Sequence, residues 1–293
     1  MDLQLQGKHV LITGGSKGIG LACAKAFLAE GARVSLVSRD SGNLELAARK
    51  LLDTIHDQTG AAAVADRANG AQSREGADGI GGADASKRVA TFAADLRDPA
   101  AALAALDSAE QAGGSVDILV NSAGAAKRVG PDDLTPQAWR DSMEAKYFTY
   151  IHMLDPVVKR MGRRGSGVIV NIVGAGGKVA SPTHLSGGAA NAALMLVSAG
   201  MAAAYGAKGV RVNAVNPGLT LTERLKEGMA AEAKLAGISI DEALERANKR
   251  LPLGRIARPE EIADAVVFLA SARASYITGA ILAMDGAVTP MVV

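Results

Sequence analysis

Short apolar runs alternate with longer amphipathic segments along the chain. The apolar runs are bounded by turn residues and cover residues 9–13, 32–37, 89–94, 118–120, 167–173, 210–216 and 280–284. Such runs are typical of β-strands. Between them apolar positions recur every three or four residues, as at Ile19, Cys23 and Phe27, in a predicted helix that has Gly31 just beyond its last turn. The alternation predicts an α/β fold, a mostly parallel sheet with helices on both faces.

A further helix is predicted to begin at Thr135, the N-cap, with Pro136 in the first helical position. Lys146 lies beside the apolar stripe of this helix and is therefore expected near its buried side. The stripe consists of Trp139, Met143, Tyr147, Tyr150, Ile151 and Leu154.

Residues 57–88 interrupt the alternation. This segment is rich in Gly, Ala, Asp and Ser and shows no clear periodicity. It is predicted to be a flexible surface insertion, with a binding flap as the alternative. Apart from this insertion, residues 1–293 are expected to form a single domain.

The clearest motif runs from Thr13 to Gly20, directly after a predicted strand and at the start of a predicted helix. Gly14 and Gly18 let the backbone turn and approach a pyrophosphate, and Gly20 permits close packing of helix on strand. The other motif positions are Gly15, Ser16, Lys17 and Ile19. Unpaired N–H groups at a helix N-terminus bind phosphate, so the segment predicts a dinucleotide site rather than a glycine-rich turn without a ligand.

The end of the second predicted strand indicates which dinucleotide is bound. An NAD site has an acidic residue there for the ribose hydroxyls, whereas this chain has Ser38, Arg39 and Asp40. Arg39 and Lys17 are two cations that suit a 2′-phosphate, which favours NADP. Two alternatives are that both cations are solvated surface charges, and that Asp40 turns inward.

These residues resemble the classical short-chain dehydrogenases/reductases, whose domain is a single Rossmann-like, doubly wound parallel sheet. The glycine segment is similar to the family's TGxxxGxG motif. The resemblance implies further cofactor contacts in three segments: Asp95 and Leu96; Asn121, Ser122, Ala123 and Gly124; and Pro217, Gly218, Thr220 and Thr222. Asp285-Gly286 and the segment from Arg258 to Glu261 also match the family's C-terminal pattern.

The resemblance fails at the family's catalytic Asn, Ser, Tyr and Lys. Counted without gaps, these positions carry Lys146, Gly174, Gly187 and Asn191. Hydride delivery to a carbonyl builds an oxyanion that must be stabilised and protonated. His184 and Lys146 are the leading candidates for these tasks, because an ordinary imidazole titrates near neutrality and an ammonium can hold an oxyanion. Ser186 and Lys178 are also available nearby.

Three interpretations stay open. The protein is an NADP(H)-dependent oxidoreductase with a non-standard active site, or it reduces a substrate that needs little acid assistance, or it is an inactive NADP-binding scaffold or regulatory subunit. For His184 the alternative role is an exposed loop residue. For Lys146 it is a contact to ribose or phosphate, or a side chain that snorkels to solvent.

The composition of the chain limits the kinds of partner that we expect. The 293 residues carry 32 Lys and Arg against 30 Asp and Glu, a net charge of +2, which does not indicate a nucleic-acid partner. Cys23 is the single cysteine and is expected to be buried, which favours a reducing compartment. With no leader or membrane span recognised, we expect a cytoplasmic protein that acts on a small molecule and holds no metal. By resemblance, the Ala-rich helix after Gly187 implies a homodimer or homotetramer, with packing against its own sheet as the alternative.

Overall fold

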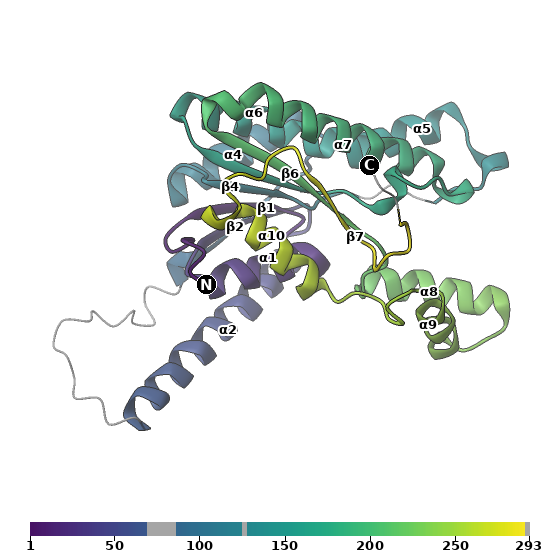
Figure 1. Cartoon of the computed structure of the whole chain (residues 1–293), viewed down its shortest axis with the longest axis horizontal. Coiled ribbons are helices and arrows are strands. Elements are labelled where there is room, and N and C mark those ends of the chain that lie inside the picture. The colour runs from purple at the N-terminus through teal and green to yellow at the C-terminus, as the bar shows by residue number, and fades with distance from the viewer. Residues whose placement is uncertain (69–85, 125–127, 291–293) are drawn as a thin grey trace.

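One parallel sheet organises the molecule. The computed structural model describes residues 1–68, 86–124 and 128–290, and in it seven strands lie in the order β3-β2-β1-β4-β5-β6-β7 (Figure 1). The strands are β1 (His9–Thr13), β2 (Arg33–Ser38), β3 (Val89–Ala93), β4 (Ile118–Asn121), β5 (Gly167–Ile172), β6 (Val210–Pro217) and β7 (Ile281–Met284). Every adjacent pair is parallel, and each predicted strand is confirmed to within one residue at either end.

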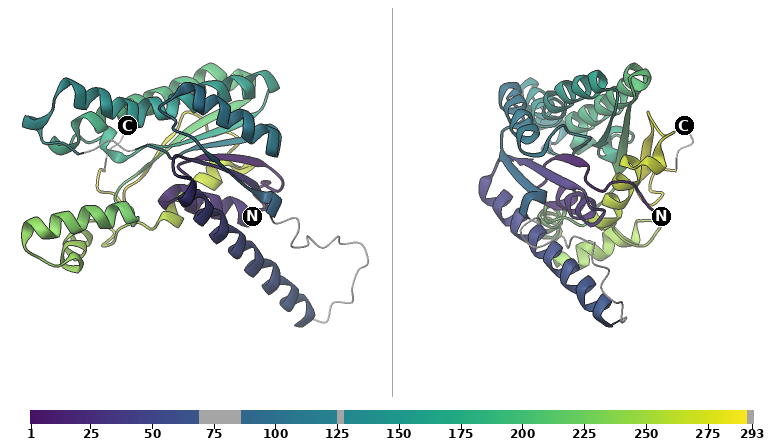
Figure 2. Two further views of the ribbon diagram at one scale, coloured as in Figure 1. Left: turned by 180° about the vertical axis from the view of Figure 1, so that it is seen from behind. Right: turned by 90° about the vertical axis from the view of Figure 1, so that its left-hand side faces the viewer.

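Helices cover both faces of the sheet, as Figure 2 shows from two sides. Helices α1, α2 and α10 pack on one face, and α4, α6 and α7 on the other. The long helices are α1 (Gly18–Ala29), α2 (Ser41–Ala68), α4 (Pro99–Gly113), α5 (Pro136–Ser142), α6 (Thr149–Arg164), α7 (Leu185–Tyr205), α8 (Glu223–Ala236), α9 (Ile240–Lys249) and α10 (Pro259–Ala270). Helices α5, α8 and α9 lie beyond the carboxyl ends of the strands (Figure 1), the edge where ligands bind in open α/β sheets.

The structure confirms two helix ends that capping residues predict, the C-terminus of α1 and the N-terminus of α5. Gly31 follows α1 with a φ of 78°, the left-handed conformation of a helix C-terminus. Thr135 Oγ1 accepts a hydrogen bond from the Ala138 N–H at 3.1 Å and so caps α5. Cys23 is fully buried in α1, and burial raises the pKa of its thiol, as expected of a small core residue.

Two local expectations are wrong. Residues 57–68 continue α2 rather than belonging to an irregular insertion, because the strong helix propensity of the Ala-rich end outweighs Gly60; residues 69–85 of that insertion lie outside the described residues. The apolar stripe from Trp139 does not lie on one α-helix. A π-helical turn, η3 (Met143–Phe148), separates α5 from α6, and Trp139 is 39% exposed.

An 18-residue window of the segment Pro182–Lys208, which contains α7, has a mean hydropathy of 1.4, so this helix is long and apolar enough to cross a membrane by length and composition. A core helix of a soluble protein passes the same test. Leu194 and Ala202 of α7 are buried in the described structure, in two clusters that also hold strand residues. Packing against the sheet gives a sufficient reason for this helix to be apolar.

Candidate functional site

The loop between β1 and α1 has the geometry of a phosphate cradle. Gly14 has a φ of 66°, and a Cβ there would lie 2.8 Å from the Ala123 backbone, so only glycine fits. Helix α1 begins at Gly18, and its N-cap residue Lys17 makes no side-chain capping bond. The first N–H groups of α1 therefore have no side-chain acceptor at the cap, as an anion site requires.

At the end of β2 a cation is exposed and the neighbouring carboxylate is engaged in a helix cap. Asp40 Oδ1 accepts a hydrogen bond from the Asn43 N–H at 2.7 Å, which engages Asp40 at the start of α2. Ser16 Oγ donates to Ser38 Oγ at 3.1 Å, which ties the glycine loop to β2. Arg39 is exposed and lines a cleft of about 930 Å³. Since Asp40 caps a helix, it does not take the place of the ribose-binding carboxylate.

The cleft brings together many of the residues that the sequence assigns to the cofactor. Of the predicted set, its lining contains Gly14, Ser38, Arg39, Asp95, Leu96, Ala123 and Gly124. Arg97 also lines the cleft, and the sequence did not predict it as a site residue. Its position two residues after the predicted contact Asp95 was the signal that could have identified it. Arg97 donates to both Asp95 oxygens, and this bond is the largest cause that holds the pKa of Asp95 below its usual range, with Arg39 adding its charge.

A buried polar network supports the loop after β4, where the sequence predicts cofactor contacts. Thr13 Oγ1 accepts the N–H groups of Ser122 at 3.1 Å and Ala123 at 3.2 Å and donates to Asn121 Oδ1. Asn121 Nδ2 in turn donates to Asn171 Oδ1 at 3.0 Å. The side chain of Asn121 is fully buried, so it fixes the loop and leaves the backbone of the next residues to face the cleft.

The predicted nicotinamide segment follows β6. Pro217 ends that strand, and Thr220 is buried. Thr222 Oγ1 caps α8 by accepting from the Leu225 N–H at 3.3 Å. A Cβ on Gly18 would lie 3.2 Å from the Thr222 methyl group, so the start of α8 rests against the glycine loop. Elements far apart in sequence therefore meet at one edge of the sheet.

Lys146 lies in the π-helical turn and points inward. Its Nζ donates to Tyr150 Oη at 2.8 Å and to the Ile172 carbonyl at 3.3 Å, at the end of β5. Burial, followed by the charge of Arg224, lowers the pKa of Lys146 from 10.5 to about 7. The expectation that Lys146 sits on the buried side is confirmed, and at neutral pH its amine exists in both protonation states.

His184 occupies the space above Gly187. A Cβ on Gly187 would overlap the imidazole, and one on Gly176 would lie 3.1 Å from His184 Cδ2. The ring is half-buried, and its Nδ1 is buried without a hydrogen-bond partner in the described structure. Burial lowers the pKa of His184 first, followed by the charges of Arg128, Arg224 and Lys146. The imidazole is therefore neutral near pH 7 and lies against Gly187, the residue that the sequence predicts for the position of the family's Tyr.

Asn191 joins the same cluster. It is buried, its Nδ2 lies 3.2 Å from where a Cβ on Gly174 would be, and its Oδ1 has no partner in the described structure. A buried unpaired acceptor costs about 1–3 kcal/mol, which a ligand hydroxyl would offset. Ser186 is buried and shares a hydrogen bond with Ser142 at 2.8 Å, so its hydroxyl is already engaged.

The four tyrosines of the chain lie in other environments. Tyr150 is fully buried, donates to the Ile172 carbonyl, and burial raises the pKa of its hydroxyl. Tyr147 and Tyr205 pack beside the hydrophobic core, and Tyr276 is fully exposed. Within the described residues no group of three or more His, Cys, Asp or Glu could hold a metal ion.

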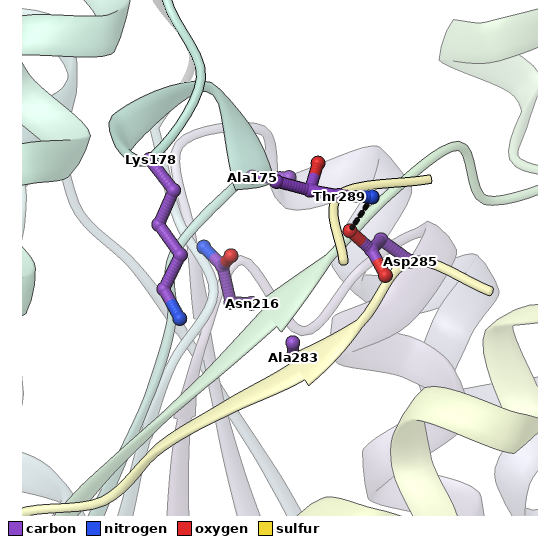
Figure 3. A pocket seen from close by; sticks show the side chains of 6 residues that line it. All are labelled: Ala175, Lys178, Asn216, Ala283, Asp285 and Thr289. Atoms are coloured by element: carbon purple, nitrogen blue, oxygen red, sulfur yellow. Dashed lines mark hydrogen bonds between the residues drawn. The ribbon is translucent and has the colours of Figure 1, made fainter. Parts of the chain in front are cut away.

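Lys178 lies apart from this cluster. It lines a small cavity of about 30 Å³ with Asn216 and Asp285, space for roughly one water molecule. Figure 3 shows the Lys178 side chain running beside Asn216, while Asp285 accepts the Thr289 N–H at 3.0 Å. Lys178 is not among the charges that shift the pKa of Lys146 or His184. It is therefore the weaker candidate of the two lysines.

Known proteins share this architecture. Residues 58–289 match the family model described as enoyl-(acyl carrier protein) reductase, and residues 8–80 match the one described as short chain dehydrogenase. The chain is 37% identical to the 2-(S)-hydroxypropyl-CoM dehydrogenase 3 of Xanthobacter autotrophicus over 289 residues, which cover 99% of each protein.

Two solved structures are informative. The L-sorbose reductase of Gluconobacter frateurii, complexed with NADPH and L-sorbose, superimposes with a TM-score of 0.83 at 29% identity over 100% of both chains. An NADPH-bound short chain oxidoreductase from Pseudomonas aeruginosa, described as containing an atypical catalytic center, gives a TM-score of 0.77 at 27% identity over 97% of this chain and 98% of that one.

Proposed function

Because the chain belongs to the short-chain dehydrogenase family, we propose that it is an NADP(H)-dependent oxidoreductase in which Lys146 exchanges the proton with the substrate oxygen. The observation that carries this proposal is the half-buried amine of Lys146, hydrogen-bonded at the end of β5 and with a pKa of about 7. A general acid is most effective when its pKa lies near the working pH.

The described residues fit NADP. The uncapped start of α1 and the cradle at Gly14 suit the pyrophosphate, and Arg39 and Lys17 are exposed cations for the 2′-phosphate. The unpaired Oδ1 of Asn191 suits a hydroxyl donor such as a ribose hydroxyl. When bound, the reduced cofactor supplies hydride to a carbonyl carbon.

The roles of Lys146 and His184 follow from their protonation states. In reduction the Lys146 ammonium stabilises the developing oxyanion and donates its proton, and in the reverse direction the neutral amine accepts it. His184 is neutral near pH 7 and orients the substrate oxygen through a ring N–H. These two side chains would replace the missing Ser and Tyr, with a small-molecule ketone or alcohol as substrate.

The test combines cofactor binding with single-turnover kinetics. Wild type and Lys146→Met are titrated with NADPH and NADH, then mixed with a panel of ketones, aldehydes, quinones and enones. We expect NADPH to bind both forms alike and the Lys146→Met rate to fall by about 10²–10⁴. Lys159→Met, which removes an exposed lysine of α6 paired with Asp155, serves as the control. Tight NADPH binding without turnover by the wild type would support the inactive scaffold instead.

We also propose a cytoplasmic homodimer or homotetramer. The support is the exposed face of the Ala-rich helix α7, where Leu196 is 77% exposed, and the single buried cysteine, which suits a reducing compartment. Leu196→Glu is expected to yield monomers, which light scattering on the eluting protein would detect. An unchanged mass for this variant would mean that α7 is not the interface.

A further inference from the structure

One helical hydroxyl in this chain bonds differently from the others. Thr149, the first residue of α6, is buried, and its Oγ1 donates to the Glu144 carbonyl at 3.0 Å, five residues earlier. Within the described helices, Thr54, Ser108 and Ser198 instead donate to the carbonyl four residues earlier, at 2.9, 2.9 and 2.7 Å. That carbonyl is a usual partner of a Thr or Ser hydroxyl in an α-helix. The bond of Thr149 therefore spans a wider turn.

The wider turn is η3, whose backbone is π-helical from Met143 to Phe148. The N–H groups of a π turn bond five residues back, whereas those of an α-helix bond four residues back. The Thr149 hydroxyl, which reaches the Glu144 carbonyl, matches the π register; an α register would offer it the Ala145 carbonyl. Because π turns are rare, an additional bond in this register gives the turn a reason to persist.

The loop after β4 also contacts η3. Gly124 in that loop has a φ of 90°, and a Cβ there would overlap the Ala145 carbonyl oxygen and lie 3.3 Å from Lys146 Cα. Only a glycine lets the two backbones approach so closely. The register of η3 is therefore held by the Thr149 hydroxyl and by contact with the loop where the sequence predicts the cofactor.

The register of η3 decides where Lys146 points. In the π register, Lys146 Nζ donates to Tyr150 Oη and to the Ile172 carbonyl. One residue of an α-helix corresponds to a rotation of about 100°, so a return of η3 to the α register would turn its residues by about that angle relative to α6. Such a rotation would carry the Lys146 amine away from the end of β5 and out of its buried position.

We infer that Thr149 is a positioning residue whose hydroxyl holds the π register of η3 and so keeps the Lys146 amine at the end of β5. The inference rests on the proposed function, in which Lys146 exchanges the proton, and adds the residue that positions it. Thr149 also lines the cleft of about 930 Å³, so the competing role for its hydroxyl is a contact to the cofactor.

The titration of Lys146 tests this inference without cofactor or turnover. Protein labelled with [ε-¹³C]lysine is titrated by NMR, and the signal absent from Lys146→Met identifies Lys146, with its pKa of about 7. In Thr149→Val, which keeps the size and branching of the side chain, this pKa should rise by about 1 or more toward 10.5, because less burial acts on the amine. Thr149→Ala should do the same, whereas Thr149→Ser keeps the hydroxyl and should keep the wild-type value.

The matched control is Thr54→Val. It removes a hydroxyl bond of the ordinary α register, to the Lys50 carbonyl in α2, and should leave the pKa of Lys146 unchanged. Circular dichroism verifies that each variant is folded, and Thr149→Ala replaces Thr149→Val if the valine variant is not.

Several outcomes overturn the inference. One is an unchanged pKa of Lys146 in the folded Thr149 variants that lack the hydroxyl, with or without a loss of NADPH affinity; a loss would assign the hydroxyl to the cofactor. Another is an equal rise in Thr149→Ser or Thr54→Val. An ordinary lysine pKa for Lys146 in the wild type also overturns it, because the amine would then not be held at β5. Since no hydride transfer is measured, a lack of turnover with every ketone would contradict the proposed function alone.

Discussion

The Lys146 amine lies 2.8 Å from the Tyr150 hydroxyl, and that hydroxyl donates its own proton to the Ile172 carbonyl. The nitrogen also lies 4.2 Å from the centre of the Tyr150 ring. Tyr150 is fully buried, so in the proposed reaction its role would be to position Lys146. The π-helical turn that holds Lys146 ends next to Thr149, whose Oγ1 donates to the Glu144 carbonyl at 3.0 Å. Such turns often occur at functional sites.

The pH dependence of reduction should follow Lys146. Its pKa of about 7 means that the proton-donating ammonium is lost as pH rises above 7. Single-turnover oxidation of NADPH by a ketone should therefore be constant below that pH and fall about ten-fold per unit above it. Lys146→Arg keeps a charge throughout this range and should show no break. Tyr150 contacts Lys146 directly, the charge of Arg224 also acts on it, and the lowered pKa of His184 keeps that imidazole neutral above pH 6.5.

Oxidation of the corresponding alcohol should show the opposite slope, because it needs the neutral amine of Lys146. If the rate of Lys146→Arg changes its pH dependence at the same pH as the wild type, the proton must be exchanged by another group.

Tyr150→Phe should lower the pH above which the reduction rate falls. The substitution keeps the ring but removes the oxygen that accepts from the Lys146 ammonium, so the charged form loses a stabilising bond and the pKa of Lys146 should fall below its value of about 7. The rate at pH 8 should drop more than the rate at pH 6, with NADPH affinity unchanged. A uniform loss of rate at every pH would mean that Tyr150 has only a structural role.

Gly187→Ala should displace His184 without touching its chemistry. The new Cβ would overlap the imidazole, which must then leave its place above α7. We expect turnover to fall about ten-fold or more while NADPH affinity stays constant, because only the orientation of the imidazole is lost. The control is Gly206→Ala, directly after α7, where the new Cβ would have nothing within 4 Å, so this variant should keep full activity. Equal activity in both variants would remove His184 from the mechanism.

Periodicity was enough to predict the sheet. The runs around Val10 and Val34 alternate with helical stripes, and that pattern has few solutions other than a parallel sheet covered on both faces. The helix capped by Thr135 and the one ending before Gly31 were predictable because caps are local. The extension of α2 to Ala68 was not, since a run with several glycines has a weak helical signal.

The candidate site was only partly predictable, because it depends on contacts between distant segments. The position of Lys146 followed from its helical phase, but its hydrogen bond to Tyr150 depends on a π turn that leaves no clear pattern in the sequence. Likewise, the segment around Val129 reaches the turn that carries His184 only through a hydrogen bond from the Val129 N–H to the Thr183 carbonyl, more than 50 residues along the chain. The predicted roles of the cofactor residues stay predictions.

Arg39→Asp should change the choice of cofactor. Arg39 is exposed at the end of β2 and lines the cleft with Asp95, while Asp40 is engaged in capping α2. The loss of its charge-assisted bonds to the 2′-phosphate should weaken NADPH binding about ten-fold or more and leave NADH nearly unchanged. Arg33→Asp, at the other end of β2, should affect neither nucleotide. Fluorescence titration with both nucleotides would measure this, and equal losses for NADPH and NADH in Arg39→Asp would rule out a contact to the 2′-phosphate.

Arg211→Met should test how the end of α10 is held against the sheet. The Arg211 guanidinium on β6 donates to the carbonyls of Leu269 at 2.9 Å, Ser271 at 3.0 Å and Ile277 at 3.0 Å. Carbonyls at a helix C-terminus have no partner within the helix, and the negative end of the helix dipole favours a cation there. Without the guanidinium these half-buried acceptors lose their bonds, and the free energy of unfolding should fall by about 3 kcal/mol.

The control for Arg211→Met is Arg273→Met. Arg273 is exposed, and within the described residues its side chain makes one hydrogen bond, from Nε to the Asp2 carbonyl at 2.7 Å, so its loss should cost about 1 kcal/mol or less. Urea unfolding followed by circular dichroism would compare the two variants, with NADPH titration to verify that each folded protein keeps its site. If both variants lose the same small amount, the carbonyls at the end of α10 are satisfied by water and β6 does not anchor this helix through Arg211.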